Sequence, residues 1–260
     1  NLIHIYVESL EVSYASKENG GAADLELLPG LTELAKDNLN FSPTASLGGF
    51  YQVPGTNWTS AALISQSSGL PVLLPLTSKV YTQGAKFMPG ATTLGDILAQ
   101  QDYNQMVMFG SDARFGARNL YYQTHGNYQI FDLNTAKEEG LIPQDYSQWW
   151  GFEDSKLFTF AREKLNDLSS DSQPFELDLM TANTHSPDGL AEDSCTLDLK
   201  DNYSKAIACS DQQISAFISW LQTQNYYEDT LIIITGDHLS MDTAWFKSVA
   251  SDYSRQVYNV

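Results

Sequence analysis

The chain has 260 residues, of which 32 are acidic and 14 are basic, so its formal charge is −18. Such a charge repels nucleic acids and anionic membrane surfaces, which disfavours a role in binding polyanions. No apolar run in the sequence approaches the roughly 20 residues that cross a bilayer, and no linker or internal repeat divides the chain. We therefore expect one α/β domain over residues 1–260, without a nucleic-acid partner.

Short apolar or β-rich runs alternate with stretches of helical periodicity along the chain. In chain order, the patterns predict a strand at Leu2–Val7, helices at Gly30–Asp37, Trp58–Ser68 and Thr92–Gln101, a strand at Gln105–Gly110, a helix at Glu153–Leu168, a strand at Phe175–Ala182, a helix at Tyr203–Gln224 and a strand at Thr230–Thr235. This alternation predicts an α/β fold with a mostly parallel central sheet and helices on both faces. Because the sequence opens directly in a strand, we expect a domain excised from a longer protein.

The helix predicted at Trp58–Ser68 has an unusual first turn. Thr56 or Asn57 can cap it, while Trp58 and Thr59 crowd the positive end of the helix dipole. Backbone N–H groups at this end favour an incoming phosphate. The hydroxyl of Thr59 is therefore a candidate for chemistry, and simple capping of the helix is the alternative.

Polar side chains follow three of the predicted strands, at the edge of the sheet where ligands gather in α/β folds. Glu8 follows the first strand, His185 follows a late strand, and Asp237 with His238 follows the last one. Two carboxylates and an imidazole suit manganese, zinc or a similar ion better than calcium. Thr59 is our candidate for a fourth ligand, because a cation beside its hydroxyl would stabilise the alkoxide and make it a nucleophile. Each residue alone has an ordinary structural alternative, and only their joint placement indicates a site.

The remaining histidines and the two cysteines indicate structural roles. Cys195 and Cys209 bracket one short excursion, which favours a disulfide and hence an oxidising compartment; two reduced thiols are the alternative. We assign His4, which alternates along a strand, and His125, which lies beside a turn glycine, to structure.

Four stretches occur in the order IYVES, GTNWTSAALISQSSGLP, TANTHSPDG and GDHLSM. Together with the ACSDQ stretch they resemble the sulfatase-like branch of the alkaline phosphatase superfamily, and more narrowly its phosphoglycerol transferase and lipoteichoic acid synthase group. The likeness runs from Leu2 to Met241. It implies an alkaline phosphatase/sulfatase-like fold and a soluble domain of a membrane-anchored enzyme at the periplasmic or extracytoplasmic face of the membrane. Related enzymes continue after the Asp-His motif, so we expect part of the fold to lie beyond Val260.

The resemblance implies a role for each matching residue. Glu8, Thr59, Asp237 and His238 would hold one divalent cation, with Mn²⁺ expected first and Mg²⁺ or Zn²⁺ as alternatives. Thr59 would be the phosphorylated nucleophile. His185 would contact the phosphate or the glycerol of the substrate, or assist the leaving group.

The resemblance also indicates residues that contact the substrate. In the stretch FGSDARFGARNL, the phosphate-binding arginine of the family matches Arg118 better than Arg114 by register. Lipoteichoic acid synthases have a tryptophan shortly before this arginine, where this chain has Gly116, so we expect a differently shaped glycerol pocket. Trp58 and Trp150 are further candidates for substrate contact. For Trp150 and the tryptophan before it, stacking on a sugar is one interpretation, and buried packing is the one that we favour.

We therefore predict an enzyme that moves glycerophosphate from phosphatidylglycerol, through a covalent Thr59 intermediate, to a periplasmic glucan or a glycerol polymer. Phosphoethanolamine transfer and sulfatase-like hydrolysis are alternatives, although WTSAAL lacks the C/S-x-P-x-R motif of sulfatases. Four histidines are few for the two zinc ions of an alkaline phosphatase. A non-enzymatic alternative is an acidic extracellular carbohydrate-binding domain. We expect a monomer.

Overall fold

The computed structural model describes residues 1–43, 46–73 and 86–260. The strands within this part of the chain are β1 Leu2–Val7, β2 Gly49–Phe50, β3 Asn104–Phe109, β4 Gln129–Phe131, β5 Phe175–Met180, β6 Leu231–Gly236 and β7 Val257–Tyr258. The α-helices are α1 Pro29–Asp37, α2 Thr59–Ser68, α3 Leu94–Ala99, α4 Arg118–Thr124, α5 Leu133–Glu138, α6 Asp154–Ser170 and α7 Asn202–Leu221. The predicted alternation of strands and helices is confirmed.

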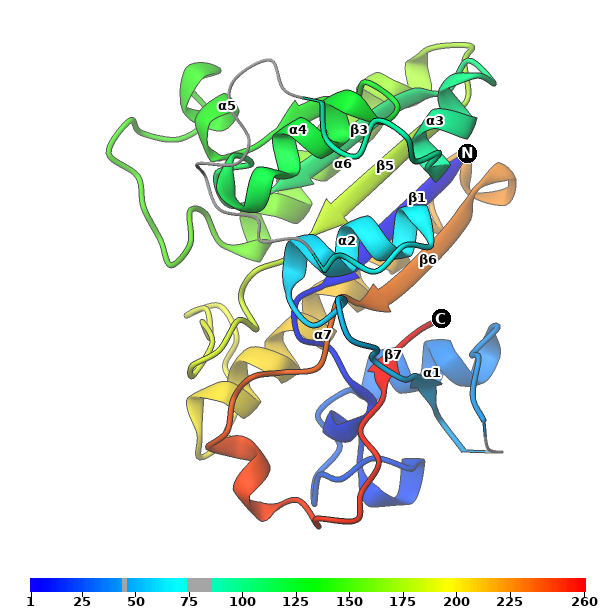
Figure 1. Cartoon of the computed structure of the whole chain (residues 1–260). Helices are drawn as coiled ribbons and strands as arrows, with labels where there is room; N and C mark the ends of the chain where they lie inside the picture. The colour runs from blue at the N-terminus through cyan, green and yellow to red at the C-terminus, as the bar shows by residue number, and fades with distance from the viewer. Residues whose placement is uncertain (44–45, 74–85) are drawn as a thin grey trace.

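Over the described residues, the main sheet is parallel and has the strand order β4-β3-β5-β1-β6 (Figure 1). β1 lies between β5 and β6, and Tyr6 of β1 is in register with Met180 on one side and Thr235 on the other. β2 and β7 form a separate antiparallel pair. Because β5, β1 and β6 run in the same direction, the residues that follow them emerge at one edge of the sheet.

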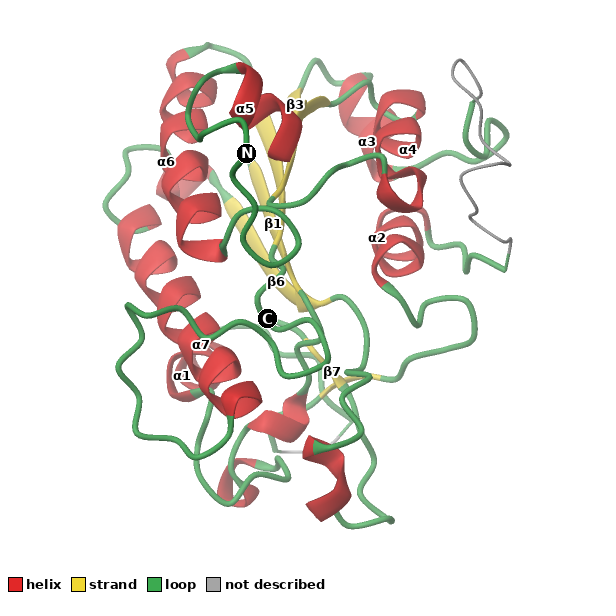
Figure 2. Cartoon of the chain, turned by 90° about the vertical axis from the view of Figure 1, so that its left-hand side faces the viewer, coloured by secondary structure: helices red, strands yellow, loops and turns green. Residues whose placement is uncertain are grey.

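Helices cover both faces of the sheet, as predicted. Figure 2 shows α1, α6 and α7 on one face and α2, α3 and α4 on the other. Side chains of β1 alternate between the two layers, as the pleat of a strand requires. Ile3 and Ile5 are fully buried in the cluster that includes α6 and α7, whereas Tyr6 packs in the cluster that includes α2 and α4.

The first turn of α2 differs from the prediction. The residue that caps the helix is Trp58, whose backbone is extended and whose side chain makes no capping hydrogen bond. The hydroxyl of Thr56 instead donates to the carbonyl oxygen of Val53. The prediction that Thr56 or Asn57 caps this helix is therefore wrong, because the chain enters the helix two residues after Thr56.

The face beneath α2 and α4 contains a buried polar layer. Nε2 of His4 lies 2.8 Å from the hydroxyl of a β6 threonine, and burial lowers the pKa of His4 to about 3, consistent with a structural role. Tyr128 donates to Glu176 over 2.6 Å, and Tyr122 donates to Asp178 over 3.1 Å. Burial raises the pKa of Glu176 to about 7 and raises the pKa of Asp178 well above its ordinary value.

The remaining structural predictions concern the cysteines and His125. Cys195 and Cys209 form the predicted disulfide, which joins the loop after β5 to α7 over a Cα–Cα distance of 5.6 Å. The ring nitrogens of His125 lie 2.8 Å from Asp96 and 2.8 Å from the carbonyl oxygen of Phe87, so this histidine is structural. Among the described helices, none has both the length and the apolar character needed to span a membrane.

Candidate active site

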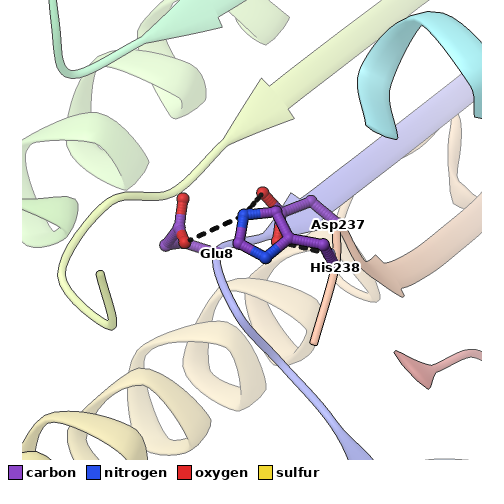
Figure 3. A group of neighbouring side chains, drawn as sticks. All are labelled: Glu8, Asp237 and His238. Carbon is purple, nitrogen blue, oxygen red and sulfur yellow. Dashed lines mark hydrogen bonds and ion pairs between the residues drawn. The ribbon is translucent and has the colours of Figure 1, made fainter. Parts of the chain in front are cut away.

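Three buried side chains meet where β1 and β6 end (Figure 3). Glu8 follows β1, and Asp237 and His238 follow β6. One ligand atom from each lies within 4.8 Å of the others. Nε2 of His238 is 3.6 Å from a Glu8 carboxylate oxygen and 3.4 Å from Oδ2 of Asp237. The structure thus brings together the three residues that the sequence placed at neighbouring strand ends.

The unsatisfied atoms of this group fit the binding of a cation. Oδ2 of Asp237 and Nε2 of His238 are buried, and neither has a hydrogen-bond partner among the described residues. Nδ1 of His238 lies 2.9 Å from the carbonyl oxygen of Leu239. A carbonyl oxygen can only accept, so Nδ1 carries a proton, and in the neutral ring this arrangement would present the lone pair of Nε2 to a metal, as a metal-ligating histidine does. A carboxylate–carboxylate–imidazole set of this kind fits a divalent transition metal.

The electrostatics of the group also favour a cation. Burial, and after it the charge of Glu8, raise the pKa of Asp237 to about 7. Burial alone would lower the pKa of His238, but the charges of Asp237 and Glu8 outweigh that effect and raise it. Two carboxylates confined in a buried space repel each other, and a bound cation would relieve this repulsion.

Thr59 lies beside this group, at the first residue of α2. Its hydroxyl donates to Oε2 of Glu8 over 3.2 Å, and its side chain is only half-buried. The hydroxyl of Ser9 donates to the other oxygen of Glu8 over 2.7 Å, and the Ser9 backbone N–H donates to Oδ1 of Asp237 over 2.7 Å. Sequence reasoning missed Ser9, although its position directly after Glu8 was a usable signal. Ser9 fixes both carboxylates relative to Thr59.

The loop after β5 brings His185 to the same edge of the sheet. The hydroxyl of Thr184 donates to the backbone carbonyl oxygen of Glu8, which ties the loop to β1. The buried carboxylate of Asp154 accepts two backbone N–H groups of the loop, over 2.8 and 3.0 Å. Nδ1 of His185 lies 2.6 Å from the carbonyl oxygen of Ser186, and Nε2 has no side-chain or backbone hydrogen bond within the described part of the chain. Sequence reasoning missed Asp154, because its role depends on packing between α6 and this loop.

Arg118 is buried at the start of α4. Its guanidinium donates to the Ser111 hydroxyl over 3.0 Å and to the Asp112 carbonyl oxygen over 2.8 Å, and it lies 4.5 Å above the Phe109 ring. Burial lowers the pKa of Arg118 to about 10, so it remains a cation at neutral pH. Arg114, the alternative in this motif, is exposed and pairs with Asp112. Arg118 is thus an arginine held in place, and its role in binding phosphate stays a prediction.

Gly116 brings the Arg118 loop against the first turn of α2. Its φ is +62°, and a Cβ at this position would lie 2.1 Å from the Ser60 hydroxyl and 3.4 Å from the Trp58 ring. A side chain at residue 116 would therefore collide with the helix that begins at Thr59. The departure from the family tryptophan coincides with this close packing, and Trp58 occupies the adjoining space.

Exposed aromatic rings lie beside His185. The Trp150 ring is 4.8 Å from the His185 ring, and Trp150 is 50 % exposed. Trp149 is also exposed, so the interpretation that these tryptophans are buried packing residues is wrong; both belong to a surface loop between α5 and α6. Phe115 is 64 % exposed and its ring lies 6.4 Å from that of Trp150. Sequence reasoning did not single out Phe115, because a lone aromatic residue gives no signal.

A parallel sheet with a buried acidic group at its strand ends, beside a threonine that opens a helix, is the arrangement that the sulfatase-like resemblance of the sequence predicts. A profile of the Sulfatase family matches residues 1–253, and the chain belongs to this family. The resemblance indicated by the four sequence motifs is thus confirmed.

Two of the similar proteins are named phosphoglycerol transferases, and a third is named a lipoteichoic acid synthase. The chain is 33% identical over 252 residues to phosphoglycerol transferase I of Escherichia coli, covering 94% of this chain but 32% of that protein. The chain therefore spans about a third of the length of this relative. The lipoteichoic acid synthase LtaP of Listeria monocytogenes has a similar fold, with a TM-score of 0.73, 19% identity, and coverage of 100% of this chain and 64% of LtaP. The phosphoglycerol transferase GacH of Streptococcus pyogenes, solved with sn-glycerol-1-phosphate, gives a TM-score of 0.63 at 14% identity, covering 99% of this chain and 66% of GacH.

Proposed function

We propose that this chain is the catalytic domain of a metal-dependent phosphoglycerol transferase, with phosphatidylglycerol as donor. The observation that supports this most directly is the hydrogen bond from Thr59 to Glu8, within a group whose buried Asp237 and His238 atoms lack partners. Through this hydrogen bond, a hydroxyl at the N-terminus of a helix lies next to a set of metal-type ligands. The identity to phosphoglycerol transferase I favours glycerophosphate over phosphoethanolamine.

In the first half-reaction, Oγ1 of Thr59 bonds to the phosphorus of the donor as the bond from phosphorus to the diacylglycerol oxygen breaks. The Thr59 proton leaves along its hydrogen bond to Glu8, and His185 supplies a proton to the departing diacylglycerol oxygen. A divalent cation held by Glu8, Asp237 and His238 would lower the pKa of the Thr59 hydroxyl and neutralise charge on the phosphate. Arg118 orients the phosphate through its fixed guanidinium.

In the second half-reaction, His185 takes a proton from a hydroxyl of the acceptor, whose oxygen bonds to the phosphorus. The bond to Oγ1 of Thr59 breaks, and Thr59 regains its proton. Two in-line displacements give retention at phosphorus. Trp58 borders the glycerol group of the intermediate, and Trp150 stacks on the incoming acceptor, a periplasmic glucan or a glycerol polymer.

The cation is Mn²⁺ in this proposal, because the ligand set mixes carboxylates with an imidazole. The domain acts as a monomer within a longer membrane-anchored protein on the extracytoplasmic side of the membrane. The disulfide between Cys195 and Cys209 supports an oxidising compartment. The match of residues 1–253 to one family supports a single catalytic domain over residues 1–260.

The test is turnover of a fluorescent phosphatidylglycerol, followed as labelled diacylglycerol. We expect turnover that chelation abolishes and Mn²⁺ restores. Thr59→Ala should lower kcat by a factor on the order of 10³ or more, because it removes the atom that bonds to phosphorus. Thr59→Ser is the matched control, and it should retain part of the activity.

Mass spectrometry of the quenched enzyme should find a glycerophosphoryl group on the peptide that contains Thr59. Equal turnover by Thr59→Ala and the parent chain would contradict the proposal. Release of diacylglycerol from phosphatidylethanolamine, with none from phosphatidylglycerol, would assign the site to phosphoethanolamine transfer instead.

A further inference from the structure

Five exposed apolar side chains flank the two ends of α2. They are Phe50, Tyr51, Val53, Leu70 and Leu73, and we call them the apolar patch. Leu73 is 75 % exposed, and the other four are between 37% and 57% exposed. Single exposed apolar residues are common, but a group of them beside a site needs an explanation.

The residues of the apolar patch are neighbours in space. Phe50, Tyr51 and Val53 line one shallow pocket of about 210 Å³ together with Pro71. A Cβ placed on Gly55 would lie 3.0 Å from atoms of both Leu73 and Pro71, so the two segments touch. The backbone N–H of Val72 also donates to the Gly55 carbonyl oxygen over 2.8 Å. The segments before and after α2 thus form one surface.

This surface adjoins the candidate active site. Asp237, one of the three metal-type residues, lines the same pocket as Phe50 and Tyr51. Val53 precedes Thr59 by six positions, and α2 connects Thr59 to the Leu70 side over about 15 Å. A partner seated on the apolar patch would therefore lie next to the group that binds the donor.

The sequence of this surface is free of charge. Residues 38–78 contain no Asp, Glu, Lys or Arg, although the whole chain has 32 acidic and 14 basic residues. All the acidic and basic residues therefore lie outside this stretch, and their net charge of −18 is repelled by the anionic headgroups of a bilayer. An apolar and uncharged segment avoids this repulsion, which would favour this face as the one that meets the membrane.

We propose that the apolar patch docks on the surface of a phospholipid bilayer, with its side chains among the upper acyl chains. This inference rests on the proposed function, in which the donor is a membrane lipid. Docking would hold α2 and Thr59 at the level of the headgroups, so that the donor phosphate reaches the site while its acyl chains stay in the bilayer. Contact through a few apolar side chains is weak and reversible, which suits repeated encounters with donor lipids.

The test is co-sedimentation of the chain with vesicles of phosphatidylcholine that contain a minor fraction of phosphatidylglycerol. Leu73→Glu and Tyr51→Glu should each lower vesicle binding by about tenfold, because each puts a charge where an apolar side chain would enter the bilayer. Leu25→Glu and Leu231→Glu are matched controls, since these residues are 65 % and 61 % exposed outside the apolar patch. They should leave binding unchanged.

Turnover separates this inference from the proposed function. Leu73→Glu should lower turnover of vesicle-embedded phosphatidylglycerol by about tenfold, yet leave turnover of a monomeric short-chain phosphatidylglycerol unchanged. Absence of vesicle binding by the parent chain, or equal losses in the control variants, would overturn the docking. Self-association of the parent chain in sedimentation velocity, if Leu73→Glu abolished it, would also overturn the docking. That result would show that the apolar patch binds a second copy of the chain. Failure of the parent chain to turn over the short-chain lipid would instead count against the proposed function, while vesicle binding stays measurable.

Discussion

Glu8 contacts more parts of the candidate site than its side chain alone could reach, because its backbone also takes part. One carboxylate oxygen accepts from Ser9 and the other from Thr59, and its backbone carbonyl oxygen accepts from Thr184. A single buried residue thereby connects Thr59, the proposed nucleophile, with the metal-type group and the loop of His185. An alanine at position 8 would remove all the side-chain contacts at once, so its effect could not be assigned to any one of them.

Arg118 and Arg114 provide a comparison at the residue scale. We expect Arg118→Ala to lower kcat/KM for phosphatidylglycerol by about tenfold to a hundredfold, because charge-assisted hydrogen bonds contribute about 1.5–3 kcal/mol. Arg114→Ala, which removes an exposed cation already paired with Asp112, should change kcat/KM by less than about twofold. Steady-state kinetics of the two variants, with their thermal midpoints as a check on folding, measure the difference. Larger losses in the Arg114 variant would transfer the phosphate-binding role to Arg114.

At the scale of elements, β5 combines a buried apolar strand with two buried carboxylates. Below about pH 4, Glu176 is protonated in both folded and unfolded chains. As the pH rises toward 7, the unfolded chain releases this proton while the folded chain, in which the pKa of Glu176 is about 7, retains it. The free energy of unfolding therefore falls with rising pH over this window.

Glu176→Gln should reduce that pH dependence. The glutamine keeps an oxygen that can accept from Tyr128 but cannot ionise, so the fall in stability between pH 5 and 7 should lessen by up to about 1.4 kcal/mol per pH unit. Urea unfolding followed by circular dichroism at pH 5, 6 and 7 measures the change of the unfolding free energy with pH. Lys36→Gln on the exposed surface is the control, and it should leave the slope unchanged. Identical slopes in the parent chain and Glu176→Gln would show that Glu176 ionises normally.

The elements that the sequence predicted are those with strong periodic signals. β1, β3, β5 and β6 are short apolar runs, and their ends therefore placed Glu8, Asp237 and His238 together. β4 has only three residues and α5 only six, too few to establish a period. The contacts of Ser9, Asp154 and Phe115 depend on how separate elements pack, and no local pattern specifies them. Thr56 was a plausible cap in sequence, but the extended backbone of Trp58 moved the start of α2 beyond it.

At the scale of the whole molecule, a buried ion pair holds the segment before β7 against the loop after β1. Glu11 is fully buried, and Arg255 donates to both of its oxygens, over 2.8 and 2.5 Å. The backbone N–H of Ser240 donates to the same carboxylate over 2.9 Å. This pair therefore also positions the segment that follows His238.

Arg255→Ala should lower the free energy of unfolding by about 2–4 kcal/mol, because it leaves the Glu11 charge buried without its partner. We expect a smaller loss of unfolding free energy than for a fully buried ion pair, because the Arg255 side chain is 29 % exposed. Urea denaturation measures the loss. The double variant with Glu11→Gln should recover part of it, whereas an equal or greater loss in the double variant would show that the pair's charges are not what stabilises this region.

The hydrogen bond from Ser9 to Asp237 joins residues 228 positions apart in the chain. During synthesis Ser9 leaves the ribosome long before Asp237 exists, so the three metal-type side chains could capture an ion together only after β6 and the two residues that follow it have emerged. Loading of the proposed metal would then follow the synthesis of β6, in whichever compartment the chain completes its central strands. The ion supply of that compartment, as much as the chemistry of the ligands, would decide which metal the finished protein contains.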